Sequence, residues 1–335
     1  MFKYNIYLFL FIVMSSCLDK VDIESKNFIQ KQLVVEGNIN NGDGPYVVKL
    51  SYAFSINEEN KRQIKNQGIF DAEVAIINST SGDRLELIPS KIPSEWGIYK
   101  SPINSSFKGL NQNEYYLEIE VENEIYQSSR EKIVTASSMD SIYAVYNENT
   151  RKMEVFVDFT DPESSKDYYI WEWNGYKRIR TFLPDVPFIE CCNICYIPLQ
   201  GNDINVFEDE FQNGQSIKKQ KISDFFIIRF NVFLIEVQQH RLNKEAYDFW
   251  NLLKLQQESQ GSLFDPPPFG IKGNISNINN KDETVLGYFY ASGISEDHLK
   301  FSAFEYAVFQ SPFEGTEDDC RKLAKADTLK PVNWD

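Results

Sequence analysis

The chain has 335 residues and a formal net charge of −15, and 42% of its residues are hydrophobic and 14% aromatic. Such an acidic surface repels phosphate backbones, which argues against nucleic acid as a partner. The hydrophobic content is sufficient for sizeable cores and the length allows two domains, so the composition excludes a disordered coat.

The first residues have the order of a secretory signal peptide. Lys3 precedes an apolar run from Ile6 to Met14, and Ser15, Ser16 and Cys17 follow. The run is shorter than the about 20 residues that a membrane-spanning helix needs, so it targets the chain without anchoring it. We predict that residues 1–16 are removed as a lipoprotein signal peptide. An ordinary signal peptide followed by a chance cysteine is the alternative.

Cys17 is the predicted lipidation site. The sequence Met14-Ser15-Ser16-Cys17 resembles a bacterial lipobox, with methionine at a position where leucine is more usual. Three acyl chains, palmitate among them, would make the membrane attachment effectively permanent. Residues 17–30 form a predicted tether, and its acidic start resembles the surface-export signal of Bacteroidota lipoproteins. We therefore expect a lipid-anchored outer-membrane protein displayed on the cell surface.

The four remaining cysteines predict disulfide bonding. An even number of cysteines is typical of an exported, disulfide-bonded chain, and four of them permit three pairings. A bond between the adjacent Cys191 and Cys192 would be strained, so we expect one of these two to bond Cys195 or Cys320. A zinc site built on Cys192 and Cys195 is the alternative, but zinc needs about four ligands. Neither of the two histidines lies at a ligand spacing from the cysteines.

Residues 31–135 alternate with the period of two that is typical of short β-strands. A turn at 40–45 separates two alternating segments, which is a hairpin signature. The clearest inward row is Tyr115, Leu117, Ile119 and Val121, which alternates with Tyr116 and three glutamates. One buried and one wet face indicate an antiparallel sheet, and we predict a β-sandwich over residues 31–135.

Residues 136–335 predict a second β-rich domain with long loops and one prominent helix. Met153, Val155, Val157 and Phe159 form an inward row, residues 184–213 read as irregular loops, and the apolar residues 225–237 favour a central strand or a bent pair of strands. Asn243 can cap a helix over 244–260, which Gly261 would end. Its apolar positions recur with helical spacing at Ala246, Phe249, Trp250 and Leu253. The fold class is therefore mainly β, with two β-sandwich-like domains.

No common catalytic motif occurs in the chain. It lacks a nucleophile elbow, a pair of zinc-binding histidines on a helix, a phosphate-binding loop and a dinucleotide fingerprint. His240, after the apolar strand, favours a surface or interfacial position, and His298 a position in a loop; structural roles suit both. We therefore predict no enzyme, no catalytic residue, no cofactor and no metal site.

Acidic and aromatic side chains leave alternatives open. Paired carboxylates would suffice for a glycosidase. The acidic residues Asp158, Asp161, Glu163 and Asp167 indicate a solvated turn, with a weak calcium site as the alternative. The aromatic residues Trp96, Tyr99, Trp171 and Trp173 could stack on sugars, although the strand alternation favours positions in the core.

Several segments together resemble one family of Bacteroidota outer-membrane lipoproteins, domain of unknown function 4249. They are Leu33–Ile39, Tyr46–Ser51, Met139–Tyr143, Tyr247–Trp250, Gly261–Pro268, Gly273–Ile275 and Leu286–Phe289. The three prolines at 266–268 indicate a rigid extended segment, and Gly273 and Gly287 suit turns or close backbone approach.

The resemblance implies a role beside a TonB-dependent outer-membrane transporter, because members of that family commonly accompany such barrels. It also implies that the first domain is an immunoglobulin-like or carboxypeptidase-regulatory-like sandwich. The expected function is therefore a non-enzymatic accessory or binding subunit of an outer-membrane β-barrel complex. The alternatives are a surface adhesion or structural envelope protein, and a glycan-acting hydrolase.

Overall fold

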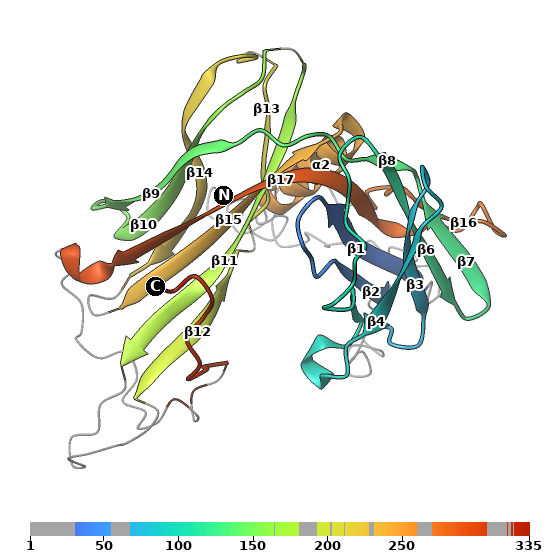
Figure 1. Cartoon of the computed structure of the whole chain (residues 1–335), viewed down its shortest axis with the longest axis horizontal. Helices are drawn as coiled ribbons and strands as arrows, with labels where there is room; N and C mark the ends of the chain where they lie inside the picture. The colour runs from blue at the N-terminus through green and yellow to red at the C-terminus, as the bar shows by residue number, and fades with distance from the viewer. Residues whose placement is uncertain are drawn as a thin grey trace, which may run out of the picture.

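The computed structural model describes residues 31–54, 68–163, 165–180, 193–201, 203–210, 212–227, 231–259, 270–306, 320, 323 and 325–335. The predicted signal peptide 1–16, the tether 17–30 with Cys17, and Cys191 and Cys192 lie outside the described residues. The described part of the chain is mainly β with one α-helix, as predicted, and forms two units that meet at an angle (Figure 1).

The first unit is built from nine strands and the start of a tenth. These strands are β1 (Gln32–Asn40), β2 (Val47–Ala53), β3 (Glu73–Asn78), β4 (Arg84–Pro89), β5 (Ile98–Lys100), β6 (Glu114–Val121), β7 (Glu124–Ser128), β8 (Glu131–Lys132) and β16 (Ile275–Asn277). They hydrogen-bond in the order β1-β2-β5-β4-β3-β6-β7-β16, with β8 on β6, and a short 3-10 helix, η1 (Pro93–Glu95), precedes β5. The predicted hairpin is confirmed, because β1 pairs with β2 antiparallel.

The second unit has two facing sheets and the helix. Its strands are β9 (Met139–Asn147), β10 (Lys152–Thr160), β11 (Tyr168–Arg180), β12 (Ile194–Gln200), β13 (Asn205–Glu208), β14 (Ser216–Phe226) and β15 (Val232–Leu242), followed by α2 (Lys244–Glu258). One sheet has three strands in the order β14-β10-β9, and the other continues through β12, β11 and β15.

Two segments of the second unit differ from the prediction. The segment 225–237 is divided between β14 and β15 of different sheets, and the expected loop region 184–213 contains β12 and β13.

The long strand β17 (Leu286–Ser302) belongs to both units, and the short 3-10 helix η2 (Ala303–Glu305) follows it. Residues 286–292 of β17 pair parallel with β1, and residues 293–302 pair antiparallel with β15. The first unit therefore also contains strands from beyond residue 135. Local alternation does not reveal such a contribution, because both β16, which pairs antiparallel with β7, and β17 lie far along the chain from their partners. The shared backbone ladder connects the two units directly, as the red strand crossing Figure 1 shows.

The predicted inward rows form the two cores. Tyr115, Leu117 and Ile119 are fully buried in the first unit, which also takes Ile275 and Phe289 from the end of the chain. In the second unit, Met153, Val155, Val157 and Phe159 are fully buried between the two sheets. Alternate burial along each strand is what the period of two predicts.

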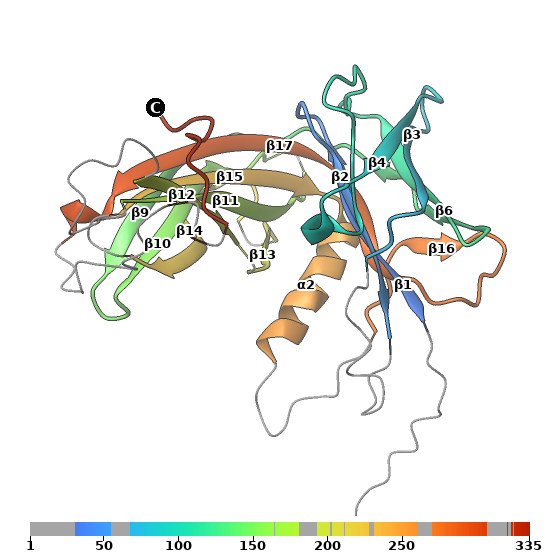
Figure 2. The ribbon, with the colours of Figure 1, turned by 90° about the horizontal axis from the view of Figure 1, so that it is seen from below.

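Helix α2 covers the opposite face of the larger sheet in the second unit. The Asn243 side chain accepts a hydrogen bond from the Ala246 N–H at 2.8 Å, so the predicted cap is confirmed. Ala246 and Phe249 are buried against β11 and β17, and Trp250 and Leu253 pack beside them. Figure 2 shows the helix projecting from the junction of the two units. No helix among the described residues is both long and apolar enough to cross a membrane.

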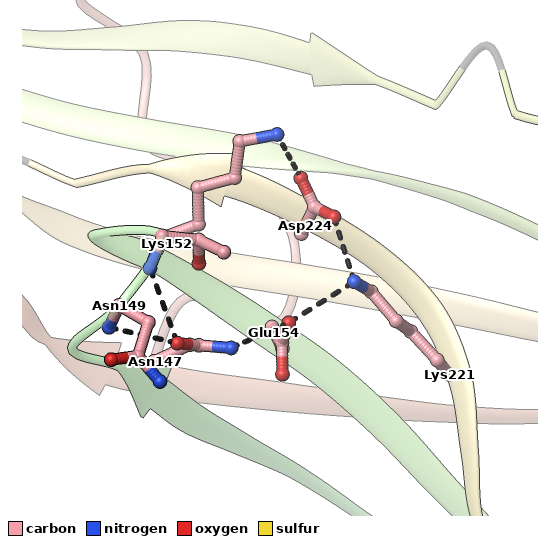
Figure 3. A network of polar contacts seen from close by, with 7 residues as sticks. Asn147, Asn149, Lys152, Glu154, Lys221 and Asp224 are labelled. Atoms are coloured by element: carbon pink, nitrogen blue, oxygen red, sulfur yellow. Dashed lines mark hydrogen bonds and ion pairs between the residues drawn. The ribbon is translucent and has the colours of Figure 1, made fainter.

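The solvent-facing side of the three-stranded sheet carries a ladder of charges (Figure 3). Lys221 of β14 contacts Glu154 at 3.1 Å and Asp224 at 2.7 Å, and Lys152 contacts the same aspartate at 2.5 Å. The Asn147 amide donates to Glu154 at 3.2 Å. These residues are partly exposed, so each pair contributes at most about 1 kcal/mol and the ladder mainly helps to fix the strand register.

Candidate functional site

A groove of about 570 Å³ lies where the two units meet. Small-molecule sites generally have volumes of about 300–1,000 Å³, so this groove has the size of a ligand site. Its lining includes Glu36, Lys49, Glu172, Trp173, Asn174, Tyr176, Gln200, Gln238 and Trp250. These residues come from β1, β2, β11, β12, β15 and α2, several of which border the angle between the units in Figure 1.

An interruption in strand pairing positions Trp173, the second of the two tryptophans of β11. Strand β13 pairs with residues 168–171 of β11, and β12 pairs with residues 174–180, so Glu172 and Trp173 lie between the two partners. A Cβ on Gly201, just after β12, would stand 2.2 Å from the Trp173 indole nitrogen. Only glycine permits this close approach of backbone to indole.

Two indole N–H groups at the groove have no hydrogen-bond partner in the described part of the chain. The Nε1 atoms of Trp173 and Trp250 are both buried, and no described residue accepts from either of them. A buried donor without a partner costs about 1–3 kcal/mol. Both atoms are covered in this structure, so the indole rings must turn toward the groove before a ligand can reach them. A ligand oxygen that then accepts from them would recover that free energy, so the pair points to an oxygen-rich ligand.

Two carboxylates of the groove, those of Glu172 and Glu36, have partners, and a third, that of Asp203, is exposed. The hydroxyl of Tyr290 donates to Glu172 at 2.8 Å, and Lys49 forms an ion pair with Glu36 at 2.9 Å. Burial, with the charge of Glu172, raises the pKa of Tyr290 well above its usual range, so this hydroxyl stays a proton donor. The groove therefore combines aromatic faces, indole donors and fixed carboxylates, which is chemistry suited to binding a polar ligand.

His240 of β15 is buried beside Tyr290 and Ser292 of β17. Its Nδ1 lies 2.9 Å from the Ser292 hydroxyl, its ring packs edge-on against Tyr290, and its Nε2 has no partner among the described residues. Burial lowers the pKa of His240, so the ring is neutral. The surface or interfacial position expected for His240 is wrong, because the ring is fully buried. His298 lies on β17 and not in the expected loop.

The predicted disulfide cysteines do not contribute to the groove lining. Cys195 and Cys320 bond each other with their Cα atoms 5.3 Å apart, and both are fully buried in a small cluster with Ile179. The expectation that Cys191 or Cys192 bonds one of them is therefore wrong, because spacing along the chain does not show which cysteines meet in the fold. A disulfide is itself confirmed, and the bond attaches the C-terminal segment to the start of β12.

The four aromatic residues considered for sugar stacking separate clearly in the structure. Tyr99 is a core residue, and Trp96 is 42% exposed and contacts Phe70. Trp171 and Trp173 both line the groove, but Trp171 is almost fully buried in the core and Trp173 is only partly buried. Trp250 was not among them, because its helical spacing assigned it to the core. One feature of the sequence could have identified Trp250 as a binding residue. The indole of a tryptophan on an amphipathic helix carries an N–H group that needs a hydrogen-bond acceptor.

Three aspartates that could hold a metal ion gather at another end of the second unit. Asp161, Asp167 and Asp209 each offer one oxygen, and these oxygens lie within 4.8 Å of one another. All three side chains are buried, with at most 3% of their surface exposed. The prediction of a solvated turn is therefore wrong for Asp161 and Asp167. Local sequence did not reveal this, because Asp209 and the strands that enclose the group come from later in the chain.

Comparisons with known proteins yield one family and a distant likeness among solved structures. A family model described as "Domain of unknown function (DUF4249)" matches residues 19–298. The comparison with curated proteins found no match. Among solved structures, a DUF4785 family protein from Legionella pneumophila subsp. pneumophila str. Philadelphia 1 aligns with 13% identity and a TM-score of 0.20. The alignment covers 62% of this chain and 52% of that protein, so the chain spans about half of its length.

Proposed function

The chain belongs to the DUF4249 family. We propose that it is a non-enzymatic, lipid-anchored binding subunit of an outer-membrane β-barrel complex. The groove between its two units is the proposed binding site. The observation that carries the binding function is the pair of indole N–H groups, of Trp173 and Trp250, that line this groove and find no acceptor among the residues that the structure describes. The ligand class is a short, oxygen-rich oligosaccharide.

The chemistry of the groove supports binding of such a ligand. Sugar hydroxyls and ring oxygens accept hydrogen bonds, and the apolar faces of sugars pack on aromatic rings, which Trp173, Tyr176 and Trp250 supply. Asn174 and Gln200 lie exposed beside them and add amide donors and acceptors. The partners of Glu172 and Glu36 favour roles in holding the groove over roles as a free acid and base.

Features of the chain support a place in the cell envelope. The order of residues 1–17 is that of a lipoprotein signal, and the disulfide between Cys195 and Cys320 suits an oxidising compartment. A TonB-dependent transporter is the proposed barrel partner, from the family resemblance of the sequence. We propose that the groove offers its ligand to this barrel.

The binding function is tested by titrating a panel of neutral oligosaccharides of increasing length into the full chain and measuring heats of binding. Trp173→Phe and Trp250→Phe keep an aromatic ring but remove the N–H. Each should weaken binding about 5–10-fold, the value of one hydrogen bond. Trp96→Phe is the matched control, because Trp96 is an exposed tryptophan outside the groove lining. Equal affinities for all three variants would place binding elsewhere, and release of shortened sugars would contradict the non-enzymatic role.

The partner is tested by extracting the tagged native protein from membranes in mild detergent. We expect a β-barrel protein of the TonB-dependent type to copurify and to comigrate on a native gel. A lipoprotein that migrates alone would count against the complex. If deletion of this protein leaves nutrient uptake normal but alters assembly of the cell surface, the structural envelope role is favoured.

A further inference from the structure

The three buried aspartates come from three separate places around one end of the second unit. Asp161 directly follows β10, Asp167 directly precedes β11, and Asp209 directly follows β13. The Asp209 N–H donates to the carbonyl oxygen of Asp167 at 3.2 Å, and the Asp161 N–H donates to that of Gln215 at 3.0 Å. The backbone therefore holds the three side chains together at a point where strand ends meet.

Two of the three carboxylates are held by protein donors. Asp161 accepts from the Tyr169 hydroxyl at 2.7 Å and from the Gly214 N–H at 3.1 Å. Asp167 accepts from Arg241 Nε at 2.9 Å and also contacts the guanidinium through a second nitrogen. Donors that fix the orientation of carboxylates in this way are typical of the surroundings of metal sites.

Asp209 has no such side-chain or guanidinium donor among the described residues. Both of its carboxylate oxygens are buried, its side chain is fully enclosed, and neither oxygen has a hydrogen-bond partner among the described residues. Its oxygen that faces the other two aspartates belongs to the group in which all three lie within 4.8 Å. A buried carboxylate without a partner is costly, so its orientation toward two other carboxylates points to a missing positive charge.

The distances and charges fit a divalent cation of the calcium type. Calcium binds six to eight oxygens at about 2.3–2.6 Å, so two ligand oxygens around one ion lie at most about 5 Å apart. When all three carboxylates are ionised, they and the guanidinium of Arg241 together carry two negative charges, which one divalent ion neutralises. Oxygen ligands without nitrogen or sulfur favour calcium over zinc.

We propose that Asp161, Asp167 and Asp209 form a structural calcium site that fastens the β10–β11 connection to the turn after β13. Calcium at this point links the end of β10, the start of β11 and the end of β13 across one face of the second unit. The affinity suits an exported protein that meets calcium outside the cytoplasm, in the range of about 0.1–1 mM. The site is separate from the groove lining, and its test does not depend on the proposed function.

The test uses the full chain, stripped with a chelator and then titrated with calcium chloride while the thermal unfolding midpoint is followed. Terbium chloride is the second probe, because Tyr169 lies against Asp161 and can transfer excitation to a bound terbium ion. We expect calcium to raise the unfolding midpoint. We also expect it to displace bound terbium, so that the terbium luminescence decreases. Magnesium should have a weaker effect, because it demands a stricter octahedral geometry.

Asp209→Asn preserves the size of the side chain and removes its charge, and it breaks no hydrogen bond made by the side chain to the described residues. It should lower the calcium affinity at least tenfold and abolish the terbium signal, while the matched exposed change Asp282→Asn should leave both unchanged. The proposal is overturned if calcium fails to move the midpoint of the unaltered chain, or if Asp209→Asn and the unaltered chain respond alike. Should Asp209→Asn not fold, the terbium and calcium titrations of the unaltered chain still decide, because absence of binding there is sufficient to reject the site.

Discussion

A Cβ atom on Gly273 would stand 1.5 Å from the carbonyl oxygen of Gly287, so the two backbones touch without room for any side chain. Gly287 also has a φ of +92°, and a Cβ there would lie 1.9 Å from the carbonyl oxygen of Val35. Gly287 is the second residue of β17 and pairs with β1. The contact therefore lies where the end of the chain joins the first unit.

Gly287→Ala should destabilise the protein by at least about 3 kcal/mol, because it adds a backbone clash to a strained φ. Gly82→Ala is the control that separates these causes. Its φ is +83°, but a Cβ there meets nothing within 4 Å, so only the strain of about 1–2 kcal/mol applies. Urea unfolding curves measure both, and an equal loss for the two variants would contradict the clash.

The glycines at 273 and 287 show what the sequence could predict. The sequence predicted that these glycines allow close backbone approach. It also predicted the buried rows of β6 and β10 and the helix cap at Asn243, because each of these features depends on residues near one another in the chain. The parallel pairing of β1 with β17 was not predicted, because it joins Val34 to Leu286 across most of the sequence. The groove and the aspartate group were missed for the same reason. Trp173 and Trp250 come to line one groove, and Asp161 and Asp209 come close together, only after distant strands have paired.

The disulfide should contribute substantially to stability, because it closes a loop with a sequence separation of 125 residues. Replacing Cys195 and Cys320 together by serine should lower the free energy of unfolding by about 2–5 kcal/mol. Reduction of the unaltered protein should produce a similar loss, since both treatments open the same loop. Proteolysis should then cut the C-terminal segment first, and an uncut segment in the double variant would show that other contacts hold it.

His240 should make the protein sensitive to acid. Burial lowers the pKa of this histidine in the folded state, and the nearby Glu172 and Glu296 only partly oppose the effect. The unfolded chain has an ordinary histidine pKa of about 6.5, so it binds the proton more readily than the folded protein does. Stability is present above that pH and falls as the pH drops below it, by up to about 1.4 kcal/mol per unit until the folded pKa is reached.

His240→Gln removes this dependence, so the slope of the unfolding free energy below about pH 6.5 should decrease relative to that of the unaltered protein. His298→Gln is the matched control, because it changes the chain's other histidine, which is exposed on β17. The acid sensitivity has a different origin if both glutamine variants keep the slope of the unaltered protein.

Arg241 and Asp167 should be strongly coupled, because their ion pair is almost fully buried and Arg241 also donates to the carbonyl oxygen of Thr135 at 2.8 Å. Arg241→Gln leaves the Asp167 charge without its partner and should cost about 3–5 kcal/mol. Asp167→Asn removes that charge, so the double variant should be more stable than the sum of the single losses predicts, by about 1–3 kcal/mol. The cycle is measured by chemical denaturation in chelator, so that a bound cation does not contribute. Additive losses would mean that Arg241 stabilises the fold through Thr135 and Ser165 alone, and that the charge of Asp167 is balanced by another group.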